Sequence, residues 1–442
     1  MRCEACRQDS TPGNKGHFHC DVLCALQAFV VAHCENILAS RNMIGYVMLF
    51  SFSVLLYWLY KKFRGPMYTP GMISSMAKKY PNAFDDESLY SQSTPTTWQM
   101  PNKVQIFHFP PSSSTTAATA GSSSAPRPRP IVAIHGGPSI APQEPWKLCQ
   151  YLPNVYLYHA RGCGHSTRIF TTFPTKGMWP GMKILEEQLG IGAQVADIER
   201  IRRRLLPQKK DNDNDKEGEN DKEDGKIDLV GHSFGGLIAT MYACEFPQYV
   251  RSLTLLVPAS VLVLPPPKGT PDFFDTVGDK IRQLGNEQYI ADYESFRKRY
   301  FDFSTLPQET DESLAKRHME FAVHFGRAEG ALIELDEIDA TLTGGMACYA
   351  SFISLGIEHN YIPACQRLLA QSTFPVAIVH GGKDLMPEST TYQYVQLFPS
   401  QNVHWEVISE EAHFLFNHPR VAEIVKETMT RTTSTAKTST GS

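Results

Sequence analysis

The amino-acid sequence predicts an α/β fold, with a mostly parallel central sheet, helices on both faces and an inserted helical cap. Three observations predict it. Short β-rich apolar runs alternate with amphipathic helical stretches, which is the pattern of a parallel sheet covered on both faces. A long helical, aromatic segment interrupts that alternation before the last strands. At 442 residues, the chain can bury a large core and still carry appendages.

The strands are predicted from runs rich in β-branched and aromatic residues, and the helices from apolar residues that recur near every 3.6 positions. The expected strands are 103–109, 131–134, 154–159, 226–230, 252–258, 375–380 and 404–409. The clearest helical stretches are 186–206 and 237–246. Together they predict one sheet whose strands alternate with covering helices.

The composition of the chain separates segments that can join a core from segments that cannot. Two polar stretches cannot join a core, and loop closure costs little extra at such lengths, so they are expected as surface insertions. The predicted organisation is a first half of the core at 101–258 with insertions at 111–130 and 207–226, a helical cap at 259–371, a second half of the core at 372–428 and a disordered tail at 429–442.

Charge and cysteine content exclude some classes. The formal net charge is −4, so nucleic acid is not an expected partner. Half of the ten cysteines lie in the first 34 residues, and the others have no regular spacing. That distribution does not resemble a small secreted domain held by disulfides.

The first 42 residues form a Cys/His-containing segment. CEAC and HFHCDVLC bring Cys3, Cys6, Cys20 and Cys24 close together in sequence. Thiolate and imidazole groups suit a tetrahedral zinc site. An irregular tail, or palmitoylated cysteines beside a membrane, would explain the same residues, and both interpretations stay open.

The run 43–60 contains eighteen residues without a charge. As a helix it would span about 27 Å at about 1.5 Å per residue, close to a hydrocarbon core of about 30 Å. Lys61 and Lys62 follow an aromatic end, which is typical of a membrane boundary. We expect a single-pass transmembrane helix, with a buried helix or an uncleaved signal segment as the alternative. A linker at 61–100 follows, and the excess of basic residues after the span favours a cytosolic body.

The stretch GHSFGG places Ser233 directly after the predicted strand 226–230 and before the predicted helix 237–246. Glycines in such a strand–turn–helix permit a strained turn that exposes the serine hydroxyl. A serine hydroxyl is a weak nucleophile, so it needs a base, an orienting acid and donors for an oxyanion. For this motif alone, the alternative is a tight turn that happens to contain a serine.

Two later strand ends supply the missing groups. Asp384 follows the strand 375–380, and His413 lies in the loop after 404–409. Ser, then Asp, then His is the chain order that a hydrolase of this architecture requires. Asp384 would orient the imidazole, and His413 would take the Ser233 proton. We therefore predict a catalytic triad of Ser233, Asp384 and His413.

The oxyanion hole is predicted from the segment HGGP, which ends the strand 131–134. Small residues there let backbone N–H groups face a developing oxyanion. We assign the hole to the amides of Gly137 and Phe234. His135 is expected to organise this loop by hydrogen bonding and not to act as a second base.

Several motifs resemble the proline iminopeptidase branch of the α/β-hydrolase fold. They are IVAIHGGP, HARGCGHS, VADIERIR, VGHSFGG, HGGKD and EEAHF. The resemblance runs from about residue 100 to 425 and implies the α/β-hydrolase fold. It also implies hydrolysis of an N-terminal residue, typically proline, from short peptides through an acyl-enzyme.

Some positions depart from this branch. Ser139 stands where a glycine usually ends HGGPG, and GHSFGG replaces GGSWGS and is closer to esterases and lipases of the fold. Peptidases of the branch hold the substrate's free α-amine with cap glutamates. The segment 324–335 faintly resembles the matching cap helix, which makes Glu329 the candidate substrate-binding residue, with a solvated surface glutamate as the alternative.

The expected function is that of a membrane-anchored serine hydrolase, an aminopeptidase that releases N-terminal proline or another residue from small peptides. An esterase or lipase acting on acyl esters is the alternative, which apolar cap residues would suit: Phe273, Phe274, Phe296, Phe301 and Phe303. A non-catalytic scaffold is a second alternative, which an intact triad disfavours. The sequence has no phosphate-binding glycine loop and no catalytic metal motif, so no cofactor is expected.

Overall fold

The computed structural model describes residues 65–79, 91–92, 97–99, 104–110, 129–206, 225–332, 334–335 and 339–431. The predicted Cys/His segment 1–42 and the apolar run 43–60 lie outside these residues, as do most of the two predicted insertions and the tail from residue 432. The zinc hypothesis for Cys3, Cys6, Cys20 and Cys24 therefore stays a hypothesis.

A nine-stranded sheet forms the centre of the molecule, with the order β1-β2-β3-β5-β4-β6-β7-β10-β11. The six strands from β5 to β11 in this order run parallel, and β1, β2 and β3 are antiparallel. Each predicted strand is present, so the predicted α/β class with a mostly parallel sheet is confirmed. The strands are β1 (Ser91–Gln92), β2 (Thr97–Gln99), β3 (Gln105–Phe109), β4 (Ile131–Ile134), β5 (Val155–Tyr158), β6 (Ile227–His232), β7 (Val250–Leu256), β10 (Val376–Gly381) and β11 (Val403–Ile408).

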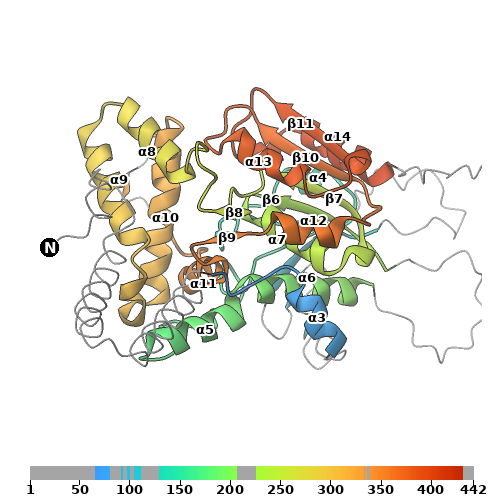
Figure 1. Cartoon of the computed structure of the whole chain (residues 1–442), viewed down its shortest axis with the longest axis horizontal. Helices are drawn as coiled ribbons and strands as arrows, with labels where there is room; N and C mark the ends of the chain where they lie inside the picture. Colours follow the sequence, from blue (N-terminus) through green and yellow to red (C-terminus); the bar gives the residue numbers. More distant parts are fainter. Residues whose placement is uncertain are drawn as a thin grey trace, which may run out of the picture.

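Helices cover both faces of the sheet (Figure 1). In β4, Val132 and Ile134 belong to one apolar cluster, and Ile131 and Ala133 belong to a second one. Because alternate residues of a strand point to opposite faces, each face of the sheet has its own core. The helices outside the cap are α3 (Met72–Lys79), α4 (Leu148–Tyr151), α5 (Met178–Leu189), α6 (Ile191–Leu205), α7 (Phe234–Glu245), α12 (Ile362–Leu369), α13 (Glu388–Val395) and α14 (Pro419–Thr430).

The predicted helix 186–206 is interrupted at Gly190, where α5 ends and α6 begins. A Cβ atom at Gly190 would lie 2.3 Å from the Ser354 hydroxyl oxygen and 2.5 Å from the Glu186 carbonyl oxygen. The chain can bend this tightly only because the residue has no side chain. Periodicity misses the break because apolar residues continue at helical spacing across it, although those of α5 and those of α6 pack in different clusters.

Three helices stand side by side beyond one end of the sheet: α8 (Phe273–Gln283), α9 (Glu287–Tyr300) and α10 (Asp311–Ala328) (Figure 1). They share an apolar cluster that includes Val277, Phe296 and Tyr300, all fully buried. The helix α11 (Gly345–Leu355) packs between α10 and α5. The predicted cap segment 259–371 thus contains a separate helical layer, although its last helix, α12, packs against α7 of the core.

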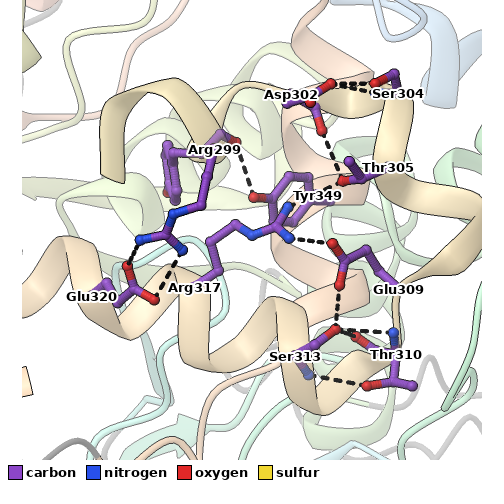
Figure 2. A network of polar contacts seen from close by, with 11 residues as sticks. Arg299, Asp302, Ser304, Thr305, Glu309, Thr310, Ser313, Arg317, Glu320 and Tyr349 are labelled. Atoms are coloured by element: carbon purple, nitrogen blue, oxygen red, sulfur yellow. Dashed lines mark hydrogen bonds and ion pairs between the residues drawn. The ribbon is translucent and has the colours of Figure 1, made fainter. Parts of the chain in front are cut away.

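Polar contacts hold this layer together (Figure 2). Arg299 of α9 pairs with Glu320 of α10 at 2.7 Å. Arg317 of α10 pairs with Glu309, which precedes that helix. The Tyr349 hydroxyl of α11 donates a hydrogen bond of 2.9 Å to the backbone of α9. The helices around α10 are therefore tied to one another by polar contacts as well as by apolar packing.

Two details differ from the expected organisation. The segment 61–100, expected as a linker, contributes α3 and the strands β1 and β2. The cap segment, expected without strands, contains a small antiparallel pair, β8 (Val263–Leu264) and β9 (His359–Asn360). Strands of two or three residues are too short to produce a readable alternation of apolar and polar side chains.

The predicted localisation, a single-pass membrane protein with a cytosolic body, is corrected. Within the described ranges of the chain, no helix is long and apolar enough to cross a bilayer. The 18-residue helix α10 has the length but carries charged residues throughout, including Lys316, Glu320 and Arg327, and charges in hydrocarbon are costly. The run 43–60, which prompted the prediction, lies outside the described residues.

Candidate active site

Ser233 occupies the turn between β6 and α7 with φ 52° and ψ −121°. A positive φ is unusual for a residue with a side chain and indicates a strained backbone held by its surroundings. Glycines make the turn possible, because a Cβ at Gly235 would lie 2.2 Å from the Ile134 carbonyl oxygen and one at Gly231 2.5 Å from that of Gly235. The sequence GHSFGG thus forms the sharp strand-to-helix turn that its glycines predict.

Asp384 and His413 lie beyond the ends of the neighbouring strands β10 and β11 and are hydrogen-bonded to each other. The distance between His413 Nδ1 and Asp384 Oδ2 is 2.8 Å. The Asp384 side chain is fully buried, and that of His413 is 9% exposed. Asp384 Oδ1 also accepts a bond of 2.7 Å from the Met386 N–H, which fixes the carboxylate.

Electrostatics keeps Asp384 ionised. Burial raises the pKa of this carboxyl, but the His413 charge and the hydrogen bonds from His413 and Met386 lower it more, so the pKa lies below its ordinary value. An ionised carboxylate on Nδ1 makes Nδ1 the protonated nitrogen of the imidazole and leaves Nε2 as an acceptor. This is the tautomer that a general base requires.

His232 joins the Ser233 turn to the His413 loop. Its Nε2 lies 2.8 Å from the His413 carbonyl oxygen, which can only accept, so Nε2 donates. Burial lowers the His232 pKa to about 3, and the imidazole is neutral. The Ser233 hydroxyl donates to no group in the described part of the chain, and such catalytic bonds often tighten only when substrate binds.

The segment 135–140, which we call the oxyanion loop, lies against the Ser233 turn. A Cβ at Gly136 would be only 2.8 Å from the Ser233 Cβ. Among the described residues, neither the Gly137 N–H nor the Phe234 N–H has a hydrogen-bond acceptor. Two unpaired donors next to a strained serine can receive a developing oxyanion.

His135 holds part of the oxyanion loop in place. Its Nδ1 lies 2.9 Å from the Gly136 carbonyl oxygen and donates to it, while Nε2 accepts from the Ala160 N–H at 3.0 Å. Burial lowers the His135 pKa to about 4. With both nitrogens engaged and no charge, His135 serves as a scaffold for the loop.

Glu329, the C-cap residue directly after α10, lies beside the Asp384–His413 pair. Burial of its carboxylate and the negative charge of Asp384 raise the Glu329 pKa, and the charge and backbone N–H of His413 partly offset this rise. The residue as a whole is exposed. The sequence-predicted site residues therefore converge at one edge of the sheet: Gly137, Ser233, Phe234, Glu329, Asp384 and His413.

Sequence reasoning missed two aromatic residues at this site. The ring centroid of Phe325 lies 5.3 Å from that of His413, in an edge-to-face arrangement. Phe414, 55% exposed, is next to His413 in the chain and 6.3 Å from Phe325. Phe325 precedes Glu329 by one helical turn, and this spacing on a helix face was the available signal.

The cap phenylalanines singled out from the sequence serve a different purpose. Phe296 is fully buried, and Phe273, Phe274 and Phe301 pack against the same cap cluster. Phe303 packs against another cluster around α5 and α11. These rings build the cap, although Phe273 also packs against the core and against Phe325, and the rings next to His413 are those of Phe325 and Phe414.

The described residues contain no group of three or more side chains suited to hold a metal ion. The five cysteines in the described part of the chain are all free and buried: Cys149, Cys163, Cys244, Cys348 and Cys365. The described residues bring a serine hydroxyl, an imidazole, two carboxylates and backbone N–H groups to this site.

One family model matches part of the chain. Residues 219–417 match the family model of the alpha/beta hydrolase fold, and no curated protein matches the chain significantly. An alpha/beta fold family hydrolase from Bacillus anthracis str. Sterne aligns with TM-score 0.44 and 16% identity over 77% of this chain and 99% of that one. A proline iminopeptidase from Mycobacterium smegmatis aligns with TM-score 0.41 and 13% identity over 76% of this chain and 96% of that one. A thermophilic esterase from Thermogutta terrifontis aligns with TM-score 0.39 and 14% identity over 77% of this chain and 95% of that one. The family match, the mostly parallel sheet and the strand–turn–helix at Ser233 give this chain the α/β-hydrolase fold.

Proposed function

We propose that the protein is a serine hydrolase that acts through an acyl-enzyme. The observation that carries the proposal is the 2.8 Å bond between His413 and Asp384 at the sheet edge where Ser233 sits on a strained turn. Ser233 Oγ attacks the substrate carbonyl carbon while His413 Nε2 takes its proton, and Asp384 stabilises the imidazolium. The N–H groups of Gly137 and Phe234 donate to the oxyanion.

The second half of the reaction uses the same groups. His413 gives its proton to the leaving group, which departs and leaves an ester between the acyl group and Ser233 Oγ. A water molecule then attacks this ester while His413 Nε2 takes its proton. Collapse of the second tetrahedral intermediate releases the acid and restores the Ser233 hydroxyl.

Within this class, we propose an aminopeptidase that releases proline or another N-terminal residue. Glu329 supports it, because its carboxylate lies next to His413 and so next to the carbonyl under attack. A substrate with a free α-ammonium group would pair with this carboxylate and place its first peptide bond at Ser233. A peptide blocked at its N-terminus would lose that pairing.

Hydrolysis of acyl esters is the second candidate. The observation that favours it is the aromatic surface of Phe325 and Phe414 beside His413, where Phe414 is 55% exposed. An apolar acyl group would bury area against these rings on binding.

Active-site labelling tests the proposed class. A fluorophosphonate probe should label the wild-type chain at Ser233, and Ser233→Ala should not be labelled. A wild-type protein that stays unlabelled would contradict the serine hydrolase assignment and favour a non-catalytic scaffold.

Substrate comparison separates the two candidates. The aminopeptidase should turn over Pro-β-naphthylamide, whereas an esterase would turn over p-nitrophenyl butyrate and leave the amide intact. In the aminopeptidase, Glu329→Gln should raise KM for the amide by about ten- to hundredfold, which corresponds to the free energy of one hydrogen bond to a charged group. Turnover of the ester should stay unchanged. Equal effects on both substrates would exclude a role of Glu329 in amine binding.

A further inference from the structure

His318 connects the cap to the oxyanion loop. It lies on α10 and is fully buried. Its Nε2 lies 2.8 Å from the carbonyl oxygen of Pro138, which follows Gly137 in the oxyanion loop. Its Nδ1 lies 2.7 Å from the hydroxyl of Tyr300, the last residue of α9. One imidazole therefore bridges two cap helices and the loop that carries an oxyanion donor.

The partners determine which nitrogen of His318 carries the proton. The Pro138 carbonyl can only accept, so Nε2 donates to it, and Nδ1 accepts from the Tyr300 hydroxyl. Burial lowers the His318 pKa to about 4 and raises that of the Tyr300 phenol, so both groups are neutral and this arrangement is stable. The hydrogen bonds have a single direction, from Tyr300 through His318 to Pro138.

The oxyanion loop needs such a restraint. Gly137 has φ 131°, and the adjacent Gly136 also lacks a side chain, so the peptide that carries the Gly137 N–H is free to rotate unless its neighbours are held. His135 holds the Gly136 carbonyl from the side of the sheet. His318 holds the Pro138 carbonyl from the side of the cap.

We infer that His318 is a positioning residue through which the cap sets the orientation of the oxyanion-hole amide of Gly137. The inference rests on the proposed function and extends it, because it makes the geometry of the hole depend on the docking of α10. His318 acts through Pro138 and does not touch the reacting atoms.

The test uses two substitutions that replace the imidazole by a side-chain amide, one on a longer side chain (Gln) and one on a shorter side chain (Asn). The amide nitrogen of His318→Gln can replace Nε2 and donate to Pro138, whereas His318→Asn reaches only toward Tyr300. His318→Leu removes both bonds. His324→Leu is the matched control, since His324 lies on the same helix, is equally buried and has no hydrogen-bond partner among the described residues.

The first readout is hydrogen exchange, in the full chain, of the two hydrogen-bonded amides at the oxyanion loop: the Gly344 N–H, which donates to the Ser139 carbonyl at 2.9 Å, and the Ala141 N–H. Exchange there should accelerate by about tenfold in His318→Asn and His318→Leu, and stay at the wild-type rate in His318→Gln and His324→Leu. Unchanged exchange in His318→Asn would overturn the inference.

The second readout is kinetic, on whichever of the two reporter substrates the wild type hydrolyses. For His318→Asn, kcat and the affinity for an alkyl trifluoromethyl ketone should both fall by about ten- to hundredfold with KM nearly unchanged, because the oxyanion exists only in the transition state. Recovery in His318→Gln supports the inference, and a matching loss in His324→Leu overturns it. If Ser233 is not labelled in the wild type, the proposed function fails, and the exchange rates alone decide whether His318 holds the loop.

Discussion

At the scale of single residues, three buried histidines each hold a backbone carbonyl at this site. His135 holds the Gly136 carbonyl, His232 holds the His413 carbonyl, and His318 holds that of Pro138. Each of them is buried and neutral and donates to a backbone oxygen. A neutral imidazole is suited to this role because it has one donor and one acceptor in a fixed plane.

His324 is the exception among these side chains. It is fully buried on α10 against the rings of Tyr293 and Phe296 of α9, and both of its nitrogens lack hydrogen-bond partners in the described part of the chain. A buried donor without an acceptor costs about 1–3 kcal/mol. The unpaired imidazole of His324 therefore lowers the free energy of unfolding of the protein.

We predict that His324→Leu increases the free energy of unfolding by about 1–2 kcal/mol, because it removes unpaired polar atoms from an apolar environment. Urea denaturation at neutral pH measures the effect. His318→Leu, which breaks two hydrogen bonds on the same helix, should have the opposite sign. A loss of stability in His324→Leu would show that the imidazole contributes favourable packing that the leucine lacks.

At the scale of elements, two motifs that mark the iminopeptidase resemblance turn out to contact each other. Arg161 of HARGCGHS forms a two-point ion pair with Asp197 of VADIERIR, with Nε 2.7 Å from Oδ2. Arg161 also donates to the Gln188 carbonyl at 2.6 Å. The pair ties the loop after β5 to α6, and the same loop supplies the Ala160 N–H that supports His135.

We predict that Asp197→Asn destabilises the fold by about 3–5 kcal/mol, since Arg161 is 4% exposed and would lose the charge that compensates it. Replacing both residues, in Arg161→Met with Asp197→Leu, should cost clearly less than the sum of the single changes. A double-mutant cycle of urea denaturation measures the coupling. Additive single effects would contradict a paired role.

At the scale of the whole molecule, burial makes stability depend on pH. It lowers the pKa of His135, His318 and His324 to about 4 and of His159 and His232 to about 3. In the unfolded chain, a histidine has a pKa of about 6.5. Between that value and about pH 4, the unfolded state binds protons that the folded state does not, so stability falls as the pH falls.

We predict that the free energy of unfolding does not depend on these histidines above about pH 6.5 and falls steeply below that pH. Each contributes up to about 1.4 kcal/mol per pH unit in this window. Thermal unfolding between pH 7.5 and 4.5 measures the slope. The stability advantage of His324→Leu should widen at the lower pH, because the variant has one linked proton fewer. A constant advantage would contradict the buried, neutral state of His324.

Local patterns in the sequence by themselves determined the fold class and the chain order of the candidate triad. Strand alternation and strand ends are visible within a few residues, and so the predicted strands and the placements of Ser233, Asp384 and His413 at strand ends follow from them. The same patterns led to the membrane prediction for 43–60, which the described helices do not support.

Only the tertiary structure decided which side chains meet. His318 and Pro138 are 180 positions apart, and Arg161 and Asp197 are 36 apart. Likewise, the proximity of Phe325 and Glu329 to His413 depends on how α10 docks at the sheet edge. Such contacts follow no sequence period and no fixed spacing, because they result from the packing of elements that lie far apart in the sequence.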